Sequence, residues 1–277
     1  MAEVLGAGNV RKMKTSLADT VQYQMLLGEI SVPLNQYLGR HLQLDYEGVI
    51  NCIHCARKTS KSFNQGYCYP CFKRLAQCDS CIISPEKCHY DAGTCREPEW
   101  GEQHCMIDHI VYLANTSGIK VGITRGTQVP TRWMDQGATQ AMPIFRVDTR
   151  HHSGMDEILF NNHIGDKTNG QAMLKGYAQP RDLEQVRQEL MAGCAAEIEH
   201  LQAQHGLQSI SVLAQAEETR ITYPVLEYPD KVKSFNLDKT PTIAGTLMGL
   251  KGQYLIFDSG VINMRKYGGY HLTLTLD

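Results

Sequence analysis

Residues 52–71 have the sequence CIHCARKTSKSFNQGYCYPC and contain two Cys-x-x-Cys pairs separated by twelve residues. Each pair presents two sulfur atoms on one side of a tight turn, and two such turns together form a tetrahedral site that suits Zn²⁺. The segment has few large aliphatic side chains, so it needs a metal ion to hold it folded. We therefore expect a structural zinc site in a zinc-ribbon-like module over residues 51–105. Its four ligands are Cys52, Cys55, Cys68 and Cys71.

Five more cysteines follow in the same module, and their spacing predicts a second four-ligand zinc site. The favoured ligands are Cys78, Cys81, Cys88 and Cys95. Cys105 or His89 is the alternative for one of the last two. An iron–sulfur cluster also takes four cysteines and is the less favoured occupant. The tenth cysteine, Cys194, lies on an apolar helical stripe, and we expect it in the core.

Composition limits the class of protein. The chain has 277 residues, of which 42% are hydrophobic and 20% charged, so it can bury a core and is not a disordered chain. No apolar run approaches the roughly 18 residues of a membrane span, and the first twenty residues contain no apolar block typical of a secretory signal. We therefore expect a cytoplasmic protein without membrane contact, in a reducing compartment where clustered cysteines bind metal.

Basic and aromatic residues are interleaved in the cysteine-rich module. From Gly48 to Tyr90 there are six basic and two acidic residues, whereas the whole chain has a net charge of −2. A basic surface beside aromatic side chains is typical of nucleic-acid binding, so we expect DNA or RNA as a partner. The candidate residues are Arg57, Lys58, Lys61, Lys73 and Arg74. The alternative is that the aromatic residues form the small core of the ribbon and the charges only face solvent.

The remaining pattern predicts an α+β fold. Alternation of apolar and polar residues indicates strands near both ends of the chain, which can share one sheet. Residues 107–127 predict a β-hairpin, Pro130 a short helix to Asp135, and residues 142–149 a third strand. A capping box over 153–156 predicts the start of a further helix, and apolar residues at three- and four-residue spacing predict one helix over 181–204.

Three single residues and one triplet in this central region follow a recognisable order. Tyr112 lies on the first hairpin strand, Lys120-Val121-Gly122 lies on the second, Arg132 lies on the short helix, and Glu157 lies on the next helix. This order resembles the GIY-YIG nuclease superfamily, and the whole chain resembles an uncharacterised bacterial family that carries such a domain behind a zinc module. The resemblance implies a small sheet with helices and an active site of Tyr112, Lys120, Arg132 and Glu157, with Mg²⁺ or Mn²⁺ at Glu157. Gly122 would let the backbone approach the substrate closely.

One departure from the family pattern affects the expected activity. Lys120 stands where better-studied members have a tyrosine, and a protonated lysine suits phosphate binding better than proton abstraction. The leading hypothesis is a zinc-containing nucleic-acid-binding protein with a GIY-YIG-like domain that acts as a divalent-metal-dependent phosphodiester hydrolase of the endonuclease type. The alternatives are a catalytically inactive RNA- or ribosome-associated binding module and a protein-interaction adaptor.

These patterns predict five regions along the chain. They are an N-terminal β region over 1–50, the zinc-binding module over 51–105, a GIY-YIG-like domain over 106–180, a helical segment over 181–215 and a C-terminal β region over 216–277.

Overall fold

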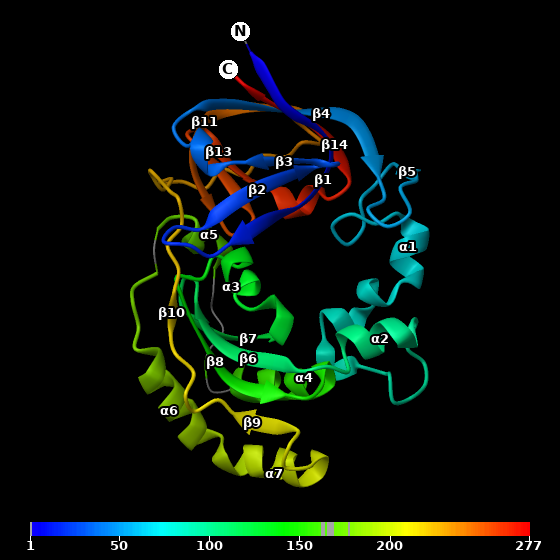
Figure 1. Cartoon of the computed structure of the whole chain (residues 1–277), viewed down its shortest axis with the longest axis vertical. Helices are drawn as coiled ribbons and strands as arrows, with labels where there is room; N and C mark the ends of the chain where they lie inside the picture. The colour runs from blue at the N-terminus through cyan, green and yellow to red at the C-terminus, as the bar shows by residue number, and fades with distance from the viewer. Residues whose placement is uncertain (1, 162–163, 165–168, 177) are drawn as a thin grey trace.

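Strands from both ends of the chain lie in one antiparallel sheet in the computed structural model, which describes residues 2–161, 164, 169–176 and 178–277 (Figure 1). Among these residues the sheet has nine strands in the order β13-β12-β11-β4-β14-β1-β2-β3, with β5 on β4. The strands are β1 (Glu3–Ser16), β2 (Gln22–Leu27), β3 (Ile30–Pro33), β4 (His41–Asn51), β5 (Lys58–Thr59), β11 (Thr242–Lys251), β12 (Tyr254–Phe257), β13 (Gly260–Asn263) and β14 (Tyr270–Leu276). The structure confirms the expectation that strands from both ends of the chain share one sheet.

Alternation of side chains explains why these strands pair. On β4, Leu42 and Leu44 are fully buried, whereas His41 is exposed and Gln43 is half-buried. Leu274 on β14 is also fully buried and lies opposite Leu44 in the register. Because successive side chains point to opposite faces, both strands place their leucines in the same core.

A second antiparallel sheet lies beside the first (Figure 1). Its strands are β6 (His109–Asn115), β7 (Ile119–Arg125), β8 (Gln140–Val147), β9 (Ile210–Val212) and β10 (Thr219–Arg220), in the order β10-β8-β6-β7 with β9 on β8. Val111 and Leu113 point to a core shared with α4 (Arg150–Asn161), α6 (Leu183–Gly193) and α7 (Ala195–His205). Tyr112 and Ala114 point to the other face and join the core of the first sheet. One apolar core therefore connects the two sheets.

The order of elements in the central region follows the sequence-based expectation. The predicted hairpin is β6–β7, and the short helix is α3 (Thr131–Asp135), which begins directly after Pro130. The third strand is β8, and it pairs with β6. These observations confirm the local structure expected for residues 107–149.

Two expected helix boundaries are wrong. The helix at 181–204 is interrupted at Cys194, whose backbone is not helical and which follows the poor helix former Gly193, so two helices form, α6 and α7. Cys194 itself is fully buried, as expected. The helix expected to start at Ser153 begins at Arg150, because the Thr149 hydroxyl accepts the N–H of residue 152 and so caps the helix earlier.

The cysteine-rich segment between β4 and β6 consists of short elements (Figure 1). They are α1 (Tyr69–Arg74), α2 (Pro98–His104) and the 3₁₀ turns η2 (Ala76–Cys78), η3 (Ser80–Ile82) and η4 (Pro85–Lys87). The other short elements of the described chain are η1 (Asn35–Tyr37), η5 (Gly126–Gln128), α5 (Gly170–Met173) and η6 (Met264–Tyr267). Within the described residues, every helix is too short or too polar to cross a bilayer.

Candidate metal centres and a basic cleft

The first cysteine group has the geometry of a metal site. The four sulfur atoms of Cys52, Cys55, Cys68 and Cys71 all lie within 4.8 Å of one another. The first pair is held by a tight turn in which the N–H of Ala56 donates to the carbonyl of Cys52 (2.8 Å). The second pair is held by the first turn of α1, for which Cys68 is the N-cap residue. Both turns therefore present sulfur to one point, and the group is positioned to hold a metal ion such as zinc.

Charge in this group also favours a cation. Although burial acts to raise the pKa of the Cys52 thiol, hydrogen bonds from the backbone N–H groups of Cys55, Cys68 and His54 outweigh it and lower that pKa to about 6. Burial and contact with the other three thiols raise the pKa of Cys71 to about 12. One thiolate thus forms readily, whereas four together repel one another unless a metal ion is bound between them.

The structure groups the remaining cysteines of the module differently from the favoured sequence-based set. Cys81, Cys88, Cys95 and Cys105 line one small cavity. Cys78 instead packs in a small apolar cluster with Leu75 and with Cys52, Cys68 and Cys71 of the first group. Cys105 therefore lines this cavity with Cys81, Cys88 and Cys95, and Cys78 does not.

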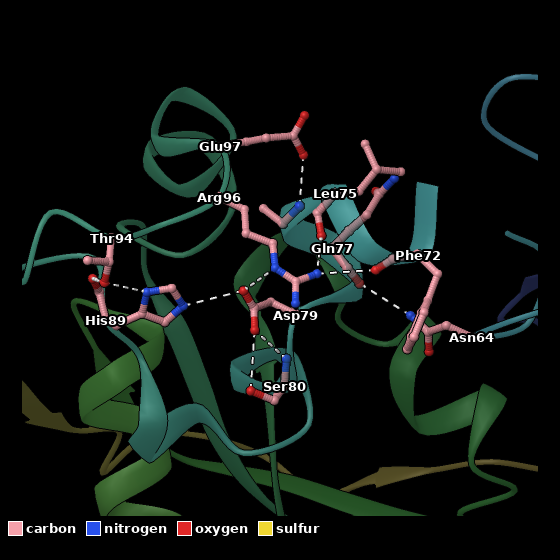
Figure 2. Close-up of polar contacts among 11 residues, drawn as sticks. Asn64, Phe72, Leu75, Gln77, Asp79, Ser80, His89, Thr94, Arg96 and Glu97 are labelled. Atoms are coloured by element: carbon pink, nitrogen blue, oxygen red, sulfur yellow. Dashed lines mark hydrogen bonds and ion pairs between the residues drawn. The ribbon is translucent and has the colours of Figure 1, made fainter. Parts of the chain in front are cut away.

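A polar network ties together the loops around this cavity (Figure 2). Arg96 Nε lies 2.7 Å from Asp79 Oδ2, and its Nη1 donates to the backbone carbonyls of Phe72 and Leu75. His89 Nε2 lies 3.3 Å from the same Asp79 oxygen. Although burial acts to raise the pKa of Asp79, the N–H of the next residue and the Arg96 charge hold it below its ordinary value. The charged Asp79 carboxylate therefore links the loops that carry His89 and Arg96 to the turn that begins at Ser80.

Tyr112 is fully buried and does not line the cleft described below. The hydrogen-bonding partners of Gln136 define the orientation of its amide. Its nitrogen donates to Tyr112 Oη (2.9 Å), and its oxygen accepts from Arg132 Nε and Nη2 (3.1 Å each). Gln136 thus links the buried phenol to the guanidinium. A Cβ on Gly122 would meet the Tyr112 ring, so this glycine makes room for a tyrosine rather than only for a substrate.

The other expected active-site residues are placed as follows. Lys120 on β7 and Arg132 on α3 both line a single large cleft. Glu157 belongs to α4, and its side chain lies outside the described part of the chain. Its assignment as a ligand of Mg²⁺ or Mn²⁺ therefore stays a prediction.

The large cleft has a volume of about 860 Å³ and is strongly basic. It lies where β1, β7, α3 and η6 meet the cysteine-rich module of residues 51–105. Its basic side chains are Arg11, Lys12, Lys120, Arg125, Arg132, Arg150 and Arg265. Among the described residues that line it, Asp135 is the one carboxylate, and Asp135 pairs with Lys12 and accepts from Gln253 Nε2 (2.9 Å). The cleft therefore offers a concentrated positive field in a chain whose net charge is −2.

The basic residues expected to bind nucleic acid lie elsewhere. All five are exposed on the cysteine-rich module and do not line the cleft: Arg57, Lys58, Lys61, Lys73 and Arg74. Sequence reasoning missed most of the cations that do line it, because they come from strands and turns far apart along the chain. A small signal was present at Arg150 and Arg265, each of which belongs to a polar, basic run of residues.

A comparison with protein families finds a match over most of the chain. The family model described as "Protein of unknown function (DUF2797)" matches residues 39–272. The matched segment begins just before β4 and ends within β14, so it includes both cysteine groups and most of the cleft. No curated protein and no solved structure matches the chain.

Proposed function

The chain belongs to the DUF2797 family, and we propose that it is a zinc-containing protein that binds single-stranded nucleic acid in its basic cleft. The observation that carries the proposal is the convergence of seven basic side chains on one cleft, with Asp135 as the one carboxylate among the described lining residues. Such a concentration of like charge is unfavourable in the free protein, and a polyanion relieves it. A phosphodiester backbone supplies negative charges at regular intervals.

The chemistry of the cations favours phosphate. Five of the seven are arginines, whose planar guanidinium groups bind phosphate oxygens through two parallel hydrogen bonds. Arg132 is held at the base of α3 by Gln136, which fixes its direction before a ligand binds. Arg265 on η6 lies close enough to Arg132 that the charge of Arg132 helps lower the Arg265 pKa, after burial as the first cause. Two guanidinium groups that repel each other form a pair of phosphate contacts once an anion lies between them.

The zinc module contributes aromatic and amide side chains to the lining of the cleft. Tyr67, Asn64 and Gln65 line the cleft from this side, and Gln65 Oε1 accepts from Arg265 Nε (2.6 Å). An aromatic ring and amide groups suit stacking and hydrogen bonding with unpaired bases. Cations that suit a phosphate backbone and groups that suit unpaired bases thus line the same cleft, which is why we propose a single strand rather than a small phosphorylated molecule.

Binding, not hydrolysis, is the activity that the described cleft supports. Asp135 has a side chain that is 3% exposed, and it is engaged by Lys12 and Gln253, so it has no free oxygen directed at a divalent ion. Hydrolysis rests on the resemblance and on Glu157, and it remains a separate hypothesis.

Fluorescence anisotropy with labelled single-stranded RNA and DNA of about 12 nucleotides tests the proposal. We expect binding that weakens steeply with salt, and Arg132→Gln and Arg265→Gln should each reduce affinity by about tenfold and make the salt dependence shallower. The matched control is Lys73→Gln, an exposed basic residue outside the cleft, which should change affinity less than twofold.

Three outcomes would contradict the proposal that the protein binds nucleic acid in the cleft without cleaving it. Equal losses in Lys73→Gln and the cleft variants would assign binding to the exposed face of the zinc module. Failure to bind either nucleic acid at low salt would favour a protein-interaction adaptor. Cleavage of the labelled strand on addition of Mg²⁺ or Mn²⁺, lost in Glu157→Gln, would show that the protein is a hydrolase and not only a binder.

A further inference from the structure

Four further cysteines line a small cavity, together with Asp79 and His89, and this cavity matches one metal ion in size. Cys81 lies in η3, Cys88 directly after η4, Cys95 in the following loop and Cys105 directly after α2, so four separate turns supply one cysteine each. The cavity between them has a volume of about 20 Å³, which is room for one water-sized occupant. Such a small space among four soft ligands suits an ion rather than an organic molecule.

A glycine allows the chain segments around the cavity to pack closely against one another. A Cβ on Gly101 would lie 3.2 Å from the Tyr90 ring and 3.5 Å from Cys95 Sγ, so the glycine lets α2 lie against the loop that carries Cys95. The N–H of Cys105 donates to the carbonyl of Gly101 (2.7 Å), which turns the chain at the end of α2 and directs Cys105 toward the cavity it lines.

We propose that Cys81, Cys88, Cys95 and Cys105 hold a second metal ion of the zinc class, independently of the first cysteine group. The site goes beyond the proposed nucleic-acid binding and does not depend on it. Four thiolates without histidine form a closed tetrahedral set, which is typical of structural rather than catalytic zinc.

A competing ligand set includes Asp79 and His89, whose ligand atoms lie within 4.8 Å of one another and of Cys81 Sγ. Asp79 is already engaged, because Oδ1 accepts from the N–H of Ser80 (2.6 Å) and Oδ2 lies 2.7 Å from Arg96 Nε (Figure 2). A metal ion at Asp79 would have to displace or lie beside the Arg96 cation. Asp79 and His89 instead brace the loops from which the cysteines project.

The second site lies where the zinc module meets the second sheet. The carbonyl of Cys105 accepts the N–H of Arg150 at the start of α4 (2.8 Å), and Pro85 of η4 lies where a Cβ on Gly154 of the same helix would stand (2.5 Å). Arg150 and Pro85 also line the basic cleft. A metal ion at the second site would therefore fix the zinc module against α4 and shape one side of the cleft.

Metal content of the purified full-length protein tests the second site. We expect two zinc ions per chain in the wild type and one in Cys105→Ser. Cys78→Ser should keep two, although Cys78 stands in a Cys-x-x-Cys pair with Cys81, and it serves as the matched control. Native mass spectrometry reports the stoichiometry of folded molecules and separates metal loss from unfolding.

A second measurement needs no variant. Replacement of zinc by ¹¹³Cd in the wild type should give two cadmium resonances, both in the range typical of four thiolate ligands. One zinc ion per chain in the wild type would overturn the proposal. Loss of a zinc ion in Cys78→Ser but not in Cys105→Ser would also overturn it, as would a cadmium resonance typical of mixed sulfur and oxygen or nitrogen ligands. None of these outcomes depends on nucleic-acid binding.

Discussion

The ring of Tyr112 occupies the space that a side chain at position 122 would need: a Cβ built on Gly122 would lie 2.7 Å from both Cζ and Oη of Tyr112. The two residues are direct partners in the β6–β7 ladder. Tyr112 also packs edge-to-face on Trp133, with ring centroids 5.9 Å apart. Packing of the Tyr112 ring thus explains why a glycine lies opposite it on the neighbouring strand, independently of any catalytic role.

Gly122→Ala should destabilise the protein by about 1–3 kcal/mol, because the added methyl group forces the Tyr112 ring out of a well-packed core. Urea denaturation monitored by circular dichroism measures the change. Gly118→Ala is the matched control, since a Cβ at that position meets nothing within 4 Å, and its stability should stay within about 0.5 kcal/mol of the wild type. Equal stability of the two variants would show that the tyrosine ring adjusts at no cost.

The bridge from Tyr112 through Gln136 to Arg132 predicts a positioning role for Gln136. Gln136→Ala removes the oxygen that accepts from Arg132, so the guanidinium becomes free to leave the direction set by α3. We expect affinity for single-stranded RNA or DNA to fall several-fold at equal folded fraction, while the salt dependence stays unchanged because the cation remains. Gln128→Ala, a second glutamine that lines the cleft, should leave affinity within twofold. If both variants bind as the wild type does, Gln136 has only a structural role.

His109 predicts a pH dependence of stability. Its side chain is fully buried, Nδ1 lies 2.7 Å from the Ile107 carbonyl, and among the described residues Nε2 has no hydrogen-bond partner. Burial, with the charges of Arg150 and Arg125, lowers the His109 pKa to about 4, whereas the unfolded chain has a value near 6.5. Between these values the unfolded state binds the extra proton, so stability falls as pH decreases from 6.5 to 4, by about 3 kcal/mol.

Comparison with His109→Asn isolates this effect, because asparagine keeps a donor for the Ile107 carbonyl but does not titrate in this range. Chemical denaturation at pH 7, 6, 5 and 4 should give a shallower decline for the variant. Metal release at acid pH affects both proteins alike, so the difference between the two curves is the informative quantity. Parallel curves would show that His109 becomes protonated in the folded protein at its ordinary pKa.

Local patterns in the sequence predict the parts of the fold that local interactions determine. The knuckle at Cys52 and Cys55, the hairpin that pairs Tyr112 with Gly122 and the helix after Pro130 each depend on neighbours within about fifteen residues, and each forms as expected. The alternation in β4 also identifies its buried face.

The features that the sequence pattern does not predict depend on contacts between distant segments. Arg11 and Arg265 line one cleft only because β1 lies beside η6 in the finished fold. Cys105 joins Cys81 because η3 and the end of α2 line the same small cavity, whereas Cys-x-x-Cys spacing alone pairs Cys81 with Cys78. Spacing along the chain identifies residue types that bind metal or phosphate, but packing decides which of them meet.

Removal of metal should unfold the cysteine-rich module and leave the two sheets folded. The small cluster that joins α1 and η2 consists of Cys52, Cys68, Cys71, Leu75 and Cys78, so most of its buried members are cysteines and it offers little apolar area. Without metal, the repulsion among buried thiolates has no counterion and the short turns of the module have no other core. The core shared by the two sheets is far larger and contains no cysteine ligand.

Hydrogen–deuterium exchange before and after treatment with a zinc chelator measures this difference. Amides in residues 52–105 should lose protection after chelation, while those of β11 and β12 should keep it, and added Zn²⁺ should restore the protected state. Cys194→Ala is the control for a buried cysteine outside the module: it should lower stability by about 1–2 kcal/mol without changing exchange in residues 52–105 or the zinc content. Unchanged protection after complete metal removal would mean that the module folds on its apolar contacts alone. Loss of protection in β11 and β12 at the same rate as in the module would mean instead that the metal sites stabilise the whole chain as one cooperative unit, which the separate cores argue against.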